Sequence, residues 1–194
     1  MNPEAGSLPR SGIHIVAVIG AGQAGRGFAM ACAAAGFYVV LEDVMPSNLR
    51  RAEAEYSDLS LRGGYGELEL ASTVEEAVRE ADIAVDFVPD ELESKLEIFS
   101  MIDRMAPPKT ILCTPSHALS ITDLASCVYR PDRCLAVQGN IGVEGEPVRL
   151  LYPPGVNQGV LQEVSSWLHR LGSATELVPD PVAPALVKNT APKP

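Results

Sequence analysis

The chain has 194 residues, of which 46% are hydrophobic, and it carries a formal net charge of −10 at pH 7. This length suits one domain with one core, and the negative charge argues against nucleic acid as a partner, because phosphates would be repelled. The four cysteines form no C-x-x-C pair, and with the three scattered histidines they predict neither a disulfide scaffold nor a metal site. No apolar run reaches the roughly 20 residues that cross a bilayer, and the start lacks the apolar centre of a signal peptide, so we expect no membrane contact and a cytoplasmic protein.

Apolar, β-branched runs alternate with amphipathic stretches over residues 13–177, which predicts an α/β fold: a Rossmann-type doubly wound, mostly parallel sheet in a single domain. Near-continuous hydrophobicity in several of the runs predicts strands buried on both faces. The chain ends are rich in proline, glycine and small polar residues, so we expect disordered or frayed tails at residues 1–12 and 188–194, with the domain at 13–187. Eight strands are predicted, at residues 13–20, 37–43, 67–71, 82–88, 110–114, 134–138, 148–152 and 174–178.

Three of the intervening segments carry helix signals. Residues 72–81 open with Ser72 and Glu75 at the spacing of a capping box. Residues 90–106 and 157–172 place apolar residues at intervals of three and four, which predicts amphipathic helices. The last of these ends at Gly172, as a helix C-terminus commonly does.

Three glycines follow the first predicted strand in the pattern G-x-G-x-x-G, at Gly20, Gly22 and Gly25. After a strand and before a helix, this pattern has a physical reason: the first glycine permits a tight turn, the second lets the backbone approach a pyrophosphate, and the third lets helix and strand pack closely. The helix N-terminus then offers unpaired N–H groups and a partial positive charge. We therefore predict a dinucleotide site here, with Gln23 and Ala24 also in contact with the cofactor.

The second strand ends in Glu42 and Asp43, 18 residues after the third glycine. A carboxylate at Asp43 would accept hydrogen bonds from the adenosine ribose and repel a 2′-phosphate, and no arginine follows before Arg50, so NAD is favoured over NADP. The alternatives are a chance glycine spacing with a solvated strand end, or FAD, which shares the pattern but usually needs more chain to cover its flavin.

The chain from about residue 13 to residue 187 resembles the NAD-binding domain of the L-3-hydroxyacyl-CoA dehydrogenase family, which serves β-oxidation and has relatives acting on hydroxybutyryl-CoA, gulonate and carnitine. The first motif is the glycine segment VIGAGQAGRGFAMACAAAGFYVVLED at residues 18–43. DFVPDELESK, at 86–95, is similar to the family pattern EA-x-x-E-x-x-x-x-K. TILCTPSHALSITDLA, at 110–125, resembles TI-x-x-SNTSSL-x-I-x-x-LA, and RPDRCLAVQGN, at 130–140, resembles x-P-x-RF-x-G-x-HFFNP.

This resemblance implies an oxidoreductase that transfers a hydride between NAD and a hydroxy or keto substrate on a CH–OH carbon. It assigns the ribose aspartate to Asp43 and places an acid and a lysine, Asp90 and Lys95, on the nicotinamide-ribose side. We expect Lys95 to reach over the cleft. The further cofactor contacts that it implies are Val88, Pro89 and Thr114.

The resemblance breaks down at the catalytic positions. The family's catalytic histidine is replaced by Gln138, whose amide cannot act as a general base at neutral pH. The glutamate that orients this histidine falls near Tyr152, and the substrate-binding serine and asparagine positions are His117 and Pro115. Asn140 supplies an amide if the register slips. His117 is therefore the candidate proton relay, and its alternative role is to cap the turn or face solvent.

Two further parts of the family pattern are reduced. The stretch at residues 44–66 is shorter than the family's basic helical arm, which helps to hold CoA, and DPVAPALVKN at 180–189 resembles only the start of the linker to a helical domain. We expect a small-molecule substrate of the acyl-CoA type, and either a homo-oligomer or a partner helical domain that completes the cleft. The alternative functions are a non-catalytic NAD(H)-binding protein and a half-enzyme that needs a partner chain.

Overall fold

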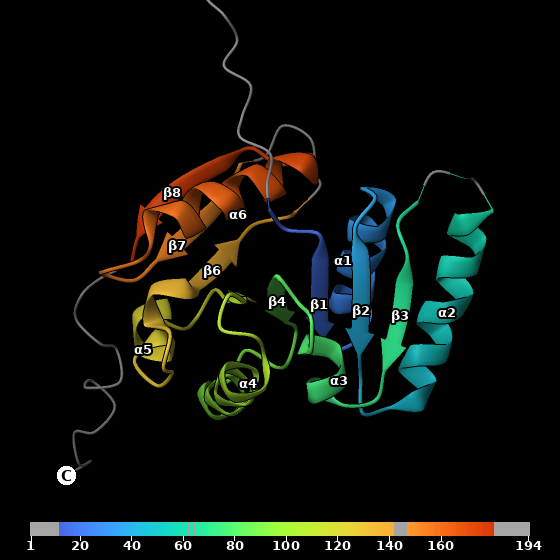
Figure 1. The fold of residues 1–194 in the computed structure, drawn as a ribbon, viewed down its shortest axis with the longest axis horizontal. Helices are drawn as coiled ribbons and strands as arrows, with labels where there is room; N and C mark the ends of the chain where they lie inside the picture. Colours follow the sequence, from blue (N-terminus) through green and yellow to red (C-terminus); the bar gives the residue numbers. More distant parts are fainter. Residues whose placement is uncertain (1–11, 62, 64, 142–146, 181–194) are drawn as a thin grey trace, which may run out of the picture.

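The computed structural model describes residues 12–61, 63, 65–141 and 147–180 (Figure 1). The predicted N-terminal tail lies outside these residues except for its last member, and the C-terminal tail, the boundary at residue 187 and nearly all of the linker-like segment at 180–189 lie outside them as well. These predictions stay untested. No helix of the described part is long and apolar enough to cross a membrane.

Within the described residues, eight strands form one sheet in the order β3-β2-β1-β4-β5-β6-β7-β8. The pair β6·β7 is antiparallel and every other neighbouring pair is parallel, which confirms the mostly parallel, doubly wound sheet. Each strand lies within one residue of its predicted range. The strands are β1 Ile15–Ile19, β2 Tyr38–Glu42, β3 Leu68–Ala71, β4 Ile83–Asp86, β5 Ile111–Pro115, β6 Cys134–Gln138, β7 Val148–Tyr152 and β8 Thr175–Pro179.

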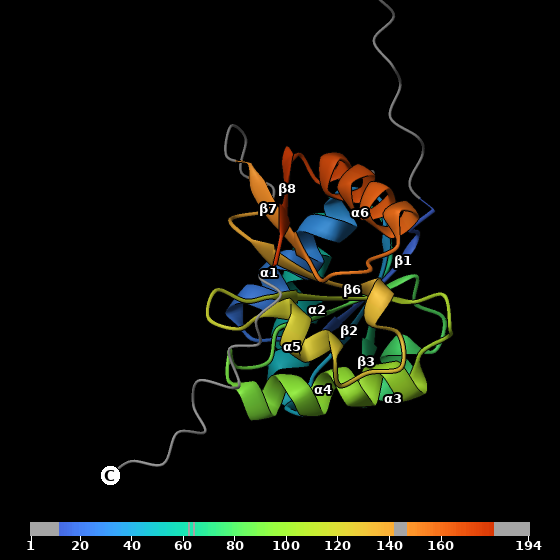
Figure 2. The same cartoon turned by 90° about the vertical axis from the view of Figure 1, so that its left-hand side faces the viewer.

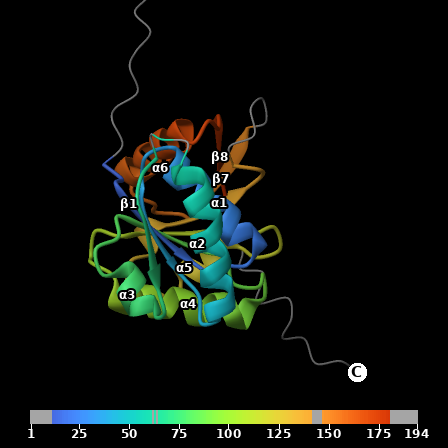
Figure 3. The ribbon, with the colours of Figure 1, turned by 90° about the vertical axis from the view of Figure 1, so that its right-hand side faces the viewer.

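Helices cover both faces of the sheet (Figures 1 and 2). Helices α1, α2 and α6 bury side chains in the core on one face, and α3, α4 and α5 do so on the other. Figure 3 views the molecule from the β3 edge, with α2 nearest the reader. The helices are α1 Gln23–Ala34, α2 Pro46–Ser60, α3 Val74–Val78, α4 Leu92–Met105, α5 Ile121–Ala125 and α6 Gln158–Arg170, with a 3-10 turn at Pro131–Arg133.

The central strands β1, β2, β4, β5 and β6 are buried on both faces, as their hydrophobicity predicts, whereas the edge strands β3 and β8 are partly exposed. On β1, Val16 and Val18 contribute to one core cluster and Ala17 and Ile19 to the other. Trp167 of α6 is fully buried in the first cluster and is the chain's single tryptophan, so it is a convenient reporter of unfolding.

The start of α3 differs from its predicted form. Thr73 caps the helix: its hydroxyl accepts a hydrogen bond from the Glu76 N–H at 3.3 Å, and the Glu76 carboxylate accepts one from the Ser72 N–H at 3.2 Å. The predicted capping pair of Ser72 and Glu75 is wrong by one residue. Both hydroxyl residues suit a cap, and the structure decides between them because Thr73 is the last extended residue before the helix.

A buried ion pair links α4 to the centre of the sheet. The Nζ of Lys95 lies 2.6 Å from Oδ1 of Asp86 at the end of β4 and 2.9 Å from Oγ1 of Thr114 in β5. The side chains of Lys95 and Asp86 are both fully buried. The burial of these two charges is tolerated because each charge is the ion-pair partner of the other.

Replacing Lys95 by methionine should lower the free energy of unfolding by about 3 to 5 kcal/mol, because it leaves a buried carboxylate at Asp86 without its counter-charge. Urea denaturation followed by Trp167 fluorescence measures this loss. The control is Lys109→Met, which removes the exposed partner of Asp82 and should cost less than about 1 kcal/mol. Equal losses for the two variants would show that the Lys95 pair is not held in a desolvated site.

Candidate functional site

The glycine loop joins β1 to α1 in a conformation that requires two of its glycines. Gly20 has a φ of +101°, a region that side chains other than glycine rarely adopt. A Cβ at Gly25 would lie 1.9 Å from the Gly20 carbonyl oxygen, so any side chain there would push the helix off the strand end. A Cβ at Gly22 would meet nothing within 4 Å, which leaves its backbone open to a ligand.

Asp43, directly after β2, is attached to this loop by hydrogen bonds. Its Oδ2 accepts the Ala21 N–H at 2.8 Å and the Asn48 side-chain amide at 3.0 Å, and its Oδ1 accepts the Met45 N–H at 2.7 Å. The carboxylate is therefore held at the junction of β2 and the glycine loop. The sequence analysis missed Ala21 and Asn48; Asn48 lies in the first turn of α2, five residues after the acid.

A cavity of about 430 Å³, which we call the Asp43 pocket, opens beside this junction on the face covered by α3 and α4. Of the predicted cofactor residues, Gly20, Gly22, Asp43, Val88 and Pro89 line it. Most of the further lining side chains are apolar, Val44, Val74, Ile98 and Met101 among them, and the polar ones are Glu42 and Asn48. The pocket thus combines apolar walls with a fixed carboxylate.

A second cavity of about 360 Å³, which we call the α1 pocket, is formed between α1 and the end of β6. Phe87 lines both pockets, so they are neighbours at the carboxyl edge of the sheet, where doubly wound folds bind their ligands. The other lining residues are Ala24, Gly27, Phe28 and Ala31 of α1, Pro115, and Val137, Gly139, Asn140 and Ile141 around the end of β6.

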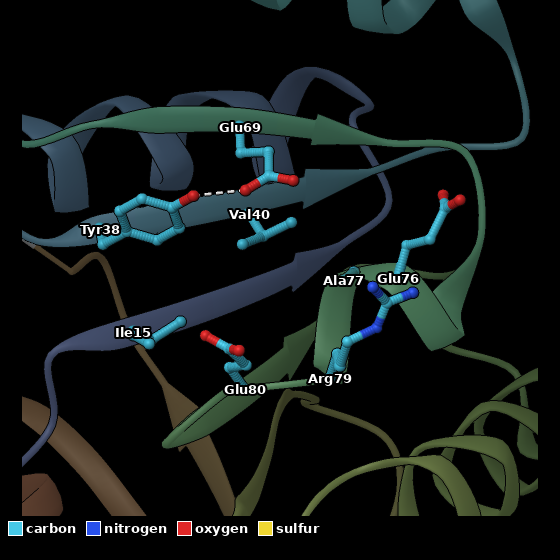
Figure 4. A pocket seen from close by; sticks show the side chains of 8 residues that line it. All are labelled: Ile15, Tyr38, Val40, Glu69, Glu76, Ala77, Arg79 and Glu80. Carbon is cyan, nitrogen blue, oxygen red and sulfur yellow. Dashed lines mark hydrogen bonds between the residues drawn. The ribbon is translucent and has the colours of Figure 1, made fainter.

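A third hollow, drawn in Figure 4, lies at the amino ends of β1 and β2 and is rich in carboxylates. The Tyr38 hydroxyl donates a hydrogen bond to Glu69, and this bond is the main cause that raises the pKa of Tyr38 to about 12. Glu76 and Glu80 also line the hollow. The three carboxylates outnumber the one cation in the lining, Arg79, so the hollow would repel a pyrophosphate and does not suit the dinucleotide.

The structure contradicts two of the predicted cofactor contacts. Lys95 does not reach over the cleft, because its side chain is fully buried and bonded to Asp86. Thr114 is equally buried, and its hydroxyl is taken by Lys95. The sequence spacing placed Lys95 correctly near the carboxyl ends of the strands, but the packing of α4 turns it toward the core.

Asp90 is exposed and organises the turn after β5. Its Oδ1 accepts the Ser116 hydroxyl at 2.6 Å, and its Oδ2 accepts the N–H groups of His117 at 3.1 Å and Ala118 at 3.4 Å. Asp90 is thus hydrogen-bonded within the protein, and it fixes the backbone that carries the exposed His117 side chain.

Two further predicted cofactor contacts, Gln23 and Ala24, lie exposed in the first turn of α1.

Both polar ends of the Gln138 amide are bonded within the protein. Its Nε2 donates to the Ser116 carbonyl at 2.9 Å, and its Oε1 accepts from Arg149 at 3.1 Å. Arg149, opposite Gln138 in the antiparallel pair, is a polar residue at this edge that the sequence analysis missed. Gln138 pairs with Arg149, and Tyr152 lies three residues further along β7. Tyr152 is therefore not opposite Gln138.

Glu42 lines the Asp43 pocket and is 4% exposed. Burial, with a smaller contribution from the charge of Asp43, raises the pKa of Glu42 from 4.5 to about 7. The folded protein therefore holds a proton here that the unfolded chain has already released. Stability from this group is present below pH 4.5 and is lost as the pH rises through 7.

We expect the free energy of unfolding to fall by about 3 kcal/mol between pH 4.5 and pH 8 through this group alone. The variant Glu42→Gln should remove this contribution, so that its stability relative to the unchanged protein increases over the same interval. Denaturation series at both pH values measure the difference. Glu53→Gln on the exposed side of α2 is the control, and identical pH profiles for all three proteins would refute the assignment.

Comparison with known proteins identifies relatives of this chain. The sequence model of the family described as "3-hydroxyacyl-CoA dehydrogenase, NAD binding domain" matches residues 15–138. The chain is 35% identical over 138 residues to a probable 3-hydroxybutyryl-CoA dehydrogenase of Bacillus subtilis (strain 168), covering 64% of this chain and 48% of that protein. It is 31% identical over 134 residues to 3-hydroxyadipyl-CoA dehydrogenase of Escherichia coli (strain K12), covering 62% and 28%. The chain thus matches less than half the length of these relatives.

Among solved structures, a diketoreductase superposes with a TM-score of 0.77 at 24% identity, covering 92% of this chain and 69% of that one. The (S)-3-hydroxybutyryl-CoA dehydrogenase PaaH1 of Ralstonia eutropha superposes with a TM-score of 0.74 at 21% identity, covering 87% and 64%. At these identities the superpositions establish the fold. The family match spans the glycine loop, Asp43, the Asp90 turn and Gln138, and on this evidence the chain belongs to the family of the 3-hydroxyacyl-CoA dehydrogenase NAD-binding domain.

Proposed function

We propose that this chain binds NAD across the glycine loop and serves an oxidoreductase of the 3-hydroxyacyl-CoA dehydrogenase type. The observation that carries the proposal is the Asp43 carboxylate, held against the Ala21 N–H at the mouth of a 430 Å³ pocket with apolar walls. Apolar walls suit an adenine ring, and the carboxylate suits the hydroxyls of its ribose. A carboxylate has about four acceptor sites, so Asp43 retains capacity beyond its bonds to the protein.

The start of α1 fits a pyrophosphate. Its first turn contains no acidic residue, and Gly22 forms its N-cap without a side-chain cap. The first N–H groups of the helix therefore have no partner within the helix, and they point with the helix dipole toward an anion. Arg26 lies beside this turn, with its Nη1 3.3 Å from the Ala21 carbonyl oxygen, and its charge is paired with Glu55, whose Oε1 lies 2.7 Å from the Arg26 Nε.

The Asp43 carboxylate at the pocket disfavours the extra phosphate of NADP, which supports NAD as the cofactor. When bound, NAD would supply the hydride acceptor or donor for the reaction. We assign the proton relay to His117, because its backbone is anchored by Asp90 at the carboxyl edge and its side chain is exposed. The substrate would be a small hydroxy or keto compound of the acyl-CoA type.

A second function, non-catalytic NAD(H) binding, is favoured by one observation. Gln138 occupies the position of the family's catalytic histidine, and both ends of its amide are engaged by Ser116 and Arg149. Such a side chain can position the turn but cannot accept the hydroxyl proton. The two functions differ in whether hydride transfer occurs after NADH binds.

The test of cofactor binding is NADH fluorescence titration. Asp43→Ala should weaken NADH binding roughly tenfold or more, because it removes a charged hydrogen-bond acceptor from the ribose and releases the Ala21 N–H. Glu69→Ala removes a carboxylate from the hollow of Figure 4 and should leave NADH affinity unchanged. Absence of NADH binding by the unchanged protein would contradict the proposed function.

The test of catalysis is the loss of NADH absorbance with acetoacetyl-CoA. His117→Ala should lower kcat by roughly a hundredfold or more with little change in NADH affinity, since a general acid–base group typically contributes this much. His169→Ala, at an exposed position on α6, is the matched control. Full activity of His117→Ala would exclude this residue as the relay. NADH binding without any turnover by the unchanged protein would favour the non-catalytic function.

A further inference from the structure

The Glu42 side chain is a buried polar group in the Asp43 pocket. The residue is 4% exposed, and it lines the cavity beside Asp43. It is the last residue of β2, and strand alternation places its side chain on the same face as Val40, which belongs to the core covered by α3 and α4. The side chain therefore enters the pocket from the sheet, whereas α3 and α4 contribute apolar side chains to it.

The carboxyl group of Glu42 has no hydrogen-bond partner in the described part of the chain. Its neighbours on the adjacent strands are Ile19 and Ala71, whose side chains carry no polar atoms. The hydrogen bond that Gly20 donates to this residue goes to its backbone carbonyl oxygen. Buried polar groups without a partner are rare, because they lose their bonds to water and gain none in return. The exception indicates that a ligand supplies the partner.

The protonation state of Glu42 determines which ligand groups it can bind. Burial, with a smaller contribution from the charge of Asp43, raises its pKa to about 7. These two residues are the titratable groups in the described lining of the pocket, and α3, α4 and the segment after β4 contribute apolar side chains to it. In its protonated form a carboxyl group donates through its O–H and accepts through its C=O.

Adenine offers the complementary pair of groups. Its 6-amino group is a donor, and the ring nitrogen beside it is an acceptor. The amide of glutamine, which has the same donor and acceptor pair as a protonated carboxyl group, binds this edge of adenine with two hydrogen bonds in protein–DNA complexes. The flat ring also suits the apolar walls formed by Val74, Ile98 and Met101. The ribose, in contrast, is matched by Asp43.

We propose that Glu42 determines the base specificity of the dinucleotide site: its carboxyl group donates a hydrogen bond to a ring nitrogen of adenine and accepts one from the 6-amino group. This inference rests on the proposed function, which places the adenosine in the Asp43 pocket. It adds a second acid, which reads the base, to the one that holds the ribose. It also couples nucleotide binding to the proton on Glu42, because the ionised carboxylate has no proton to donate and would face the lone pair of the ring nitrogen.

Two substitutions separate the hydrogen bonds of Glu42 from its charge. Glu42→Gln keeps a donor and an acceptor in the shape of the protonated side chain, and it has no proton to lose. Glu42→Met occupies similar space with neither group, and its apolar side chain suits the neighbours Ile19 and Ala71. The matched control is Glu53→Met at an exposed position on α2. Thermal unfolding of the four proteins establishes that each is folded.

The first experiment compares AMP with purine riboside 5′-phosphate, which lacks the 6-amino group, by calorimetry at about pH 6, where Glu42 is mostly protonated. The unchanged protein, Glu42→Gln and Glu53→Met should bind AMP roughly tenfold more tightly, because one hydrogen bond in a buried site is worth about this factor. Glu42→Met should bind both nucleotides equally. The inference is overturned if the unchanged protein shows no preference, or if Glu42→Met retains the full preference.

The second experiment follows the binding of ADP-ribose between about pH 6 and about pH 8.5, on either side of the Glu42 pKa of about 7. Both phosphates of this probe are esterified, so it has no proton to lose in this interval. The ligand binds the protonated form, so the unchanged protein and Glu53→Met should lose affinity roughly tenfold as the pH rises. Glu42→Gln should keep its affinity throughout. A constant affinity in the unchanged protein, or the same decline in Glu42→Gln, would contradict the coupling.

Failure of the proposed function has a different signature. If the unchanged protein binds neither AMP nor ADP-ribose, the dinucleotide site is absent, and the proposed function and this inference are both overturned. Binding of ADP-ribose without the predicted responses of the Glu42 variants would leave the dinucleotide site in place and overturn the role of Glu42 alone. The predicted responses without any turnover of NADH would contradict the catalytic function and support the role of Glu42.

Discussion

The close approach of α1 to the end of β1 is the constraint on which the carboxyl edge of this protein depends. With no side chain at Gly25, the helix packs directly on the Gly20 carbonyl. The same turn brings the Ala21 N–H within 2.8 Å of Asp43 and the Gly20 N–H within 2.8 Å of the Glu42 carbonyl. One local requirement for glycine therefore sets the positions of β1, β2 and α1, and a pocket opens on each side of the loop.

The other half of the edge is organised by side chains that bond to one another. Asp90 holds the turn after β5, and Gln138 connects this turn to β6 and, through Arg149, to β7. Below them, Lys95 joins β4 and β5 through buried contacts. These hydrogen bonds connect β4, β5, β6 and β7 at the carboxyl edge of the sheet, where doubly wound folds bind their ligands.

Strand positions were predictable to within two residues because buried parallel strands require continuous apolar runs, and such runs are visible in the sequence. The glycine loop was predictable because its requirements are local. The Thr73 cap was missed because two adjacent residues could serve, and only the backbone conformation distinguishes them. The burial of Lys95 was missed because its direction depends on how α4 is rotated against the sheet.

What the sequence by itself determined is the order of the elements, the glycine turn and the acid that follows β2, since each depends on residues close together in the chain. Tertiary structure alone decided which polar groups can bind a ligand. Lys95 and Thr114 are hydrogen-bonded to each other in the core, and Gln138 is hydrogen-bonded to Arg149 across the antiparallel pair of β6 and β7. It also created the α1 pocket, whose walls come from α1 and from the end of β6, more than a hundred residues later. Such contacts follow from packing between distant segments, and no local pattern specifies them.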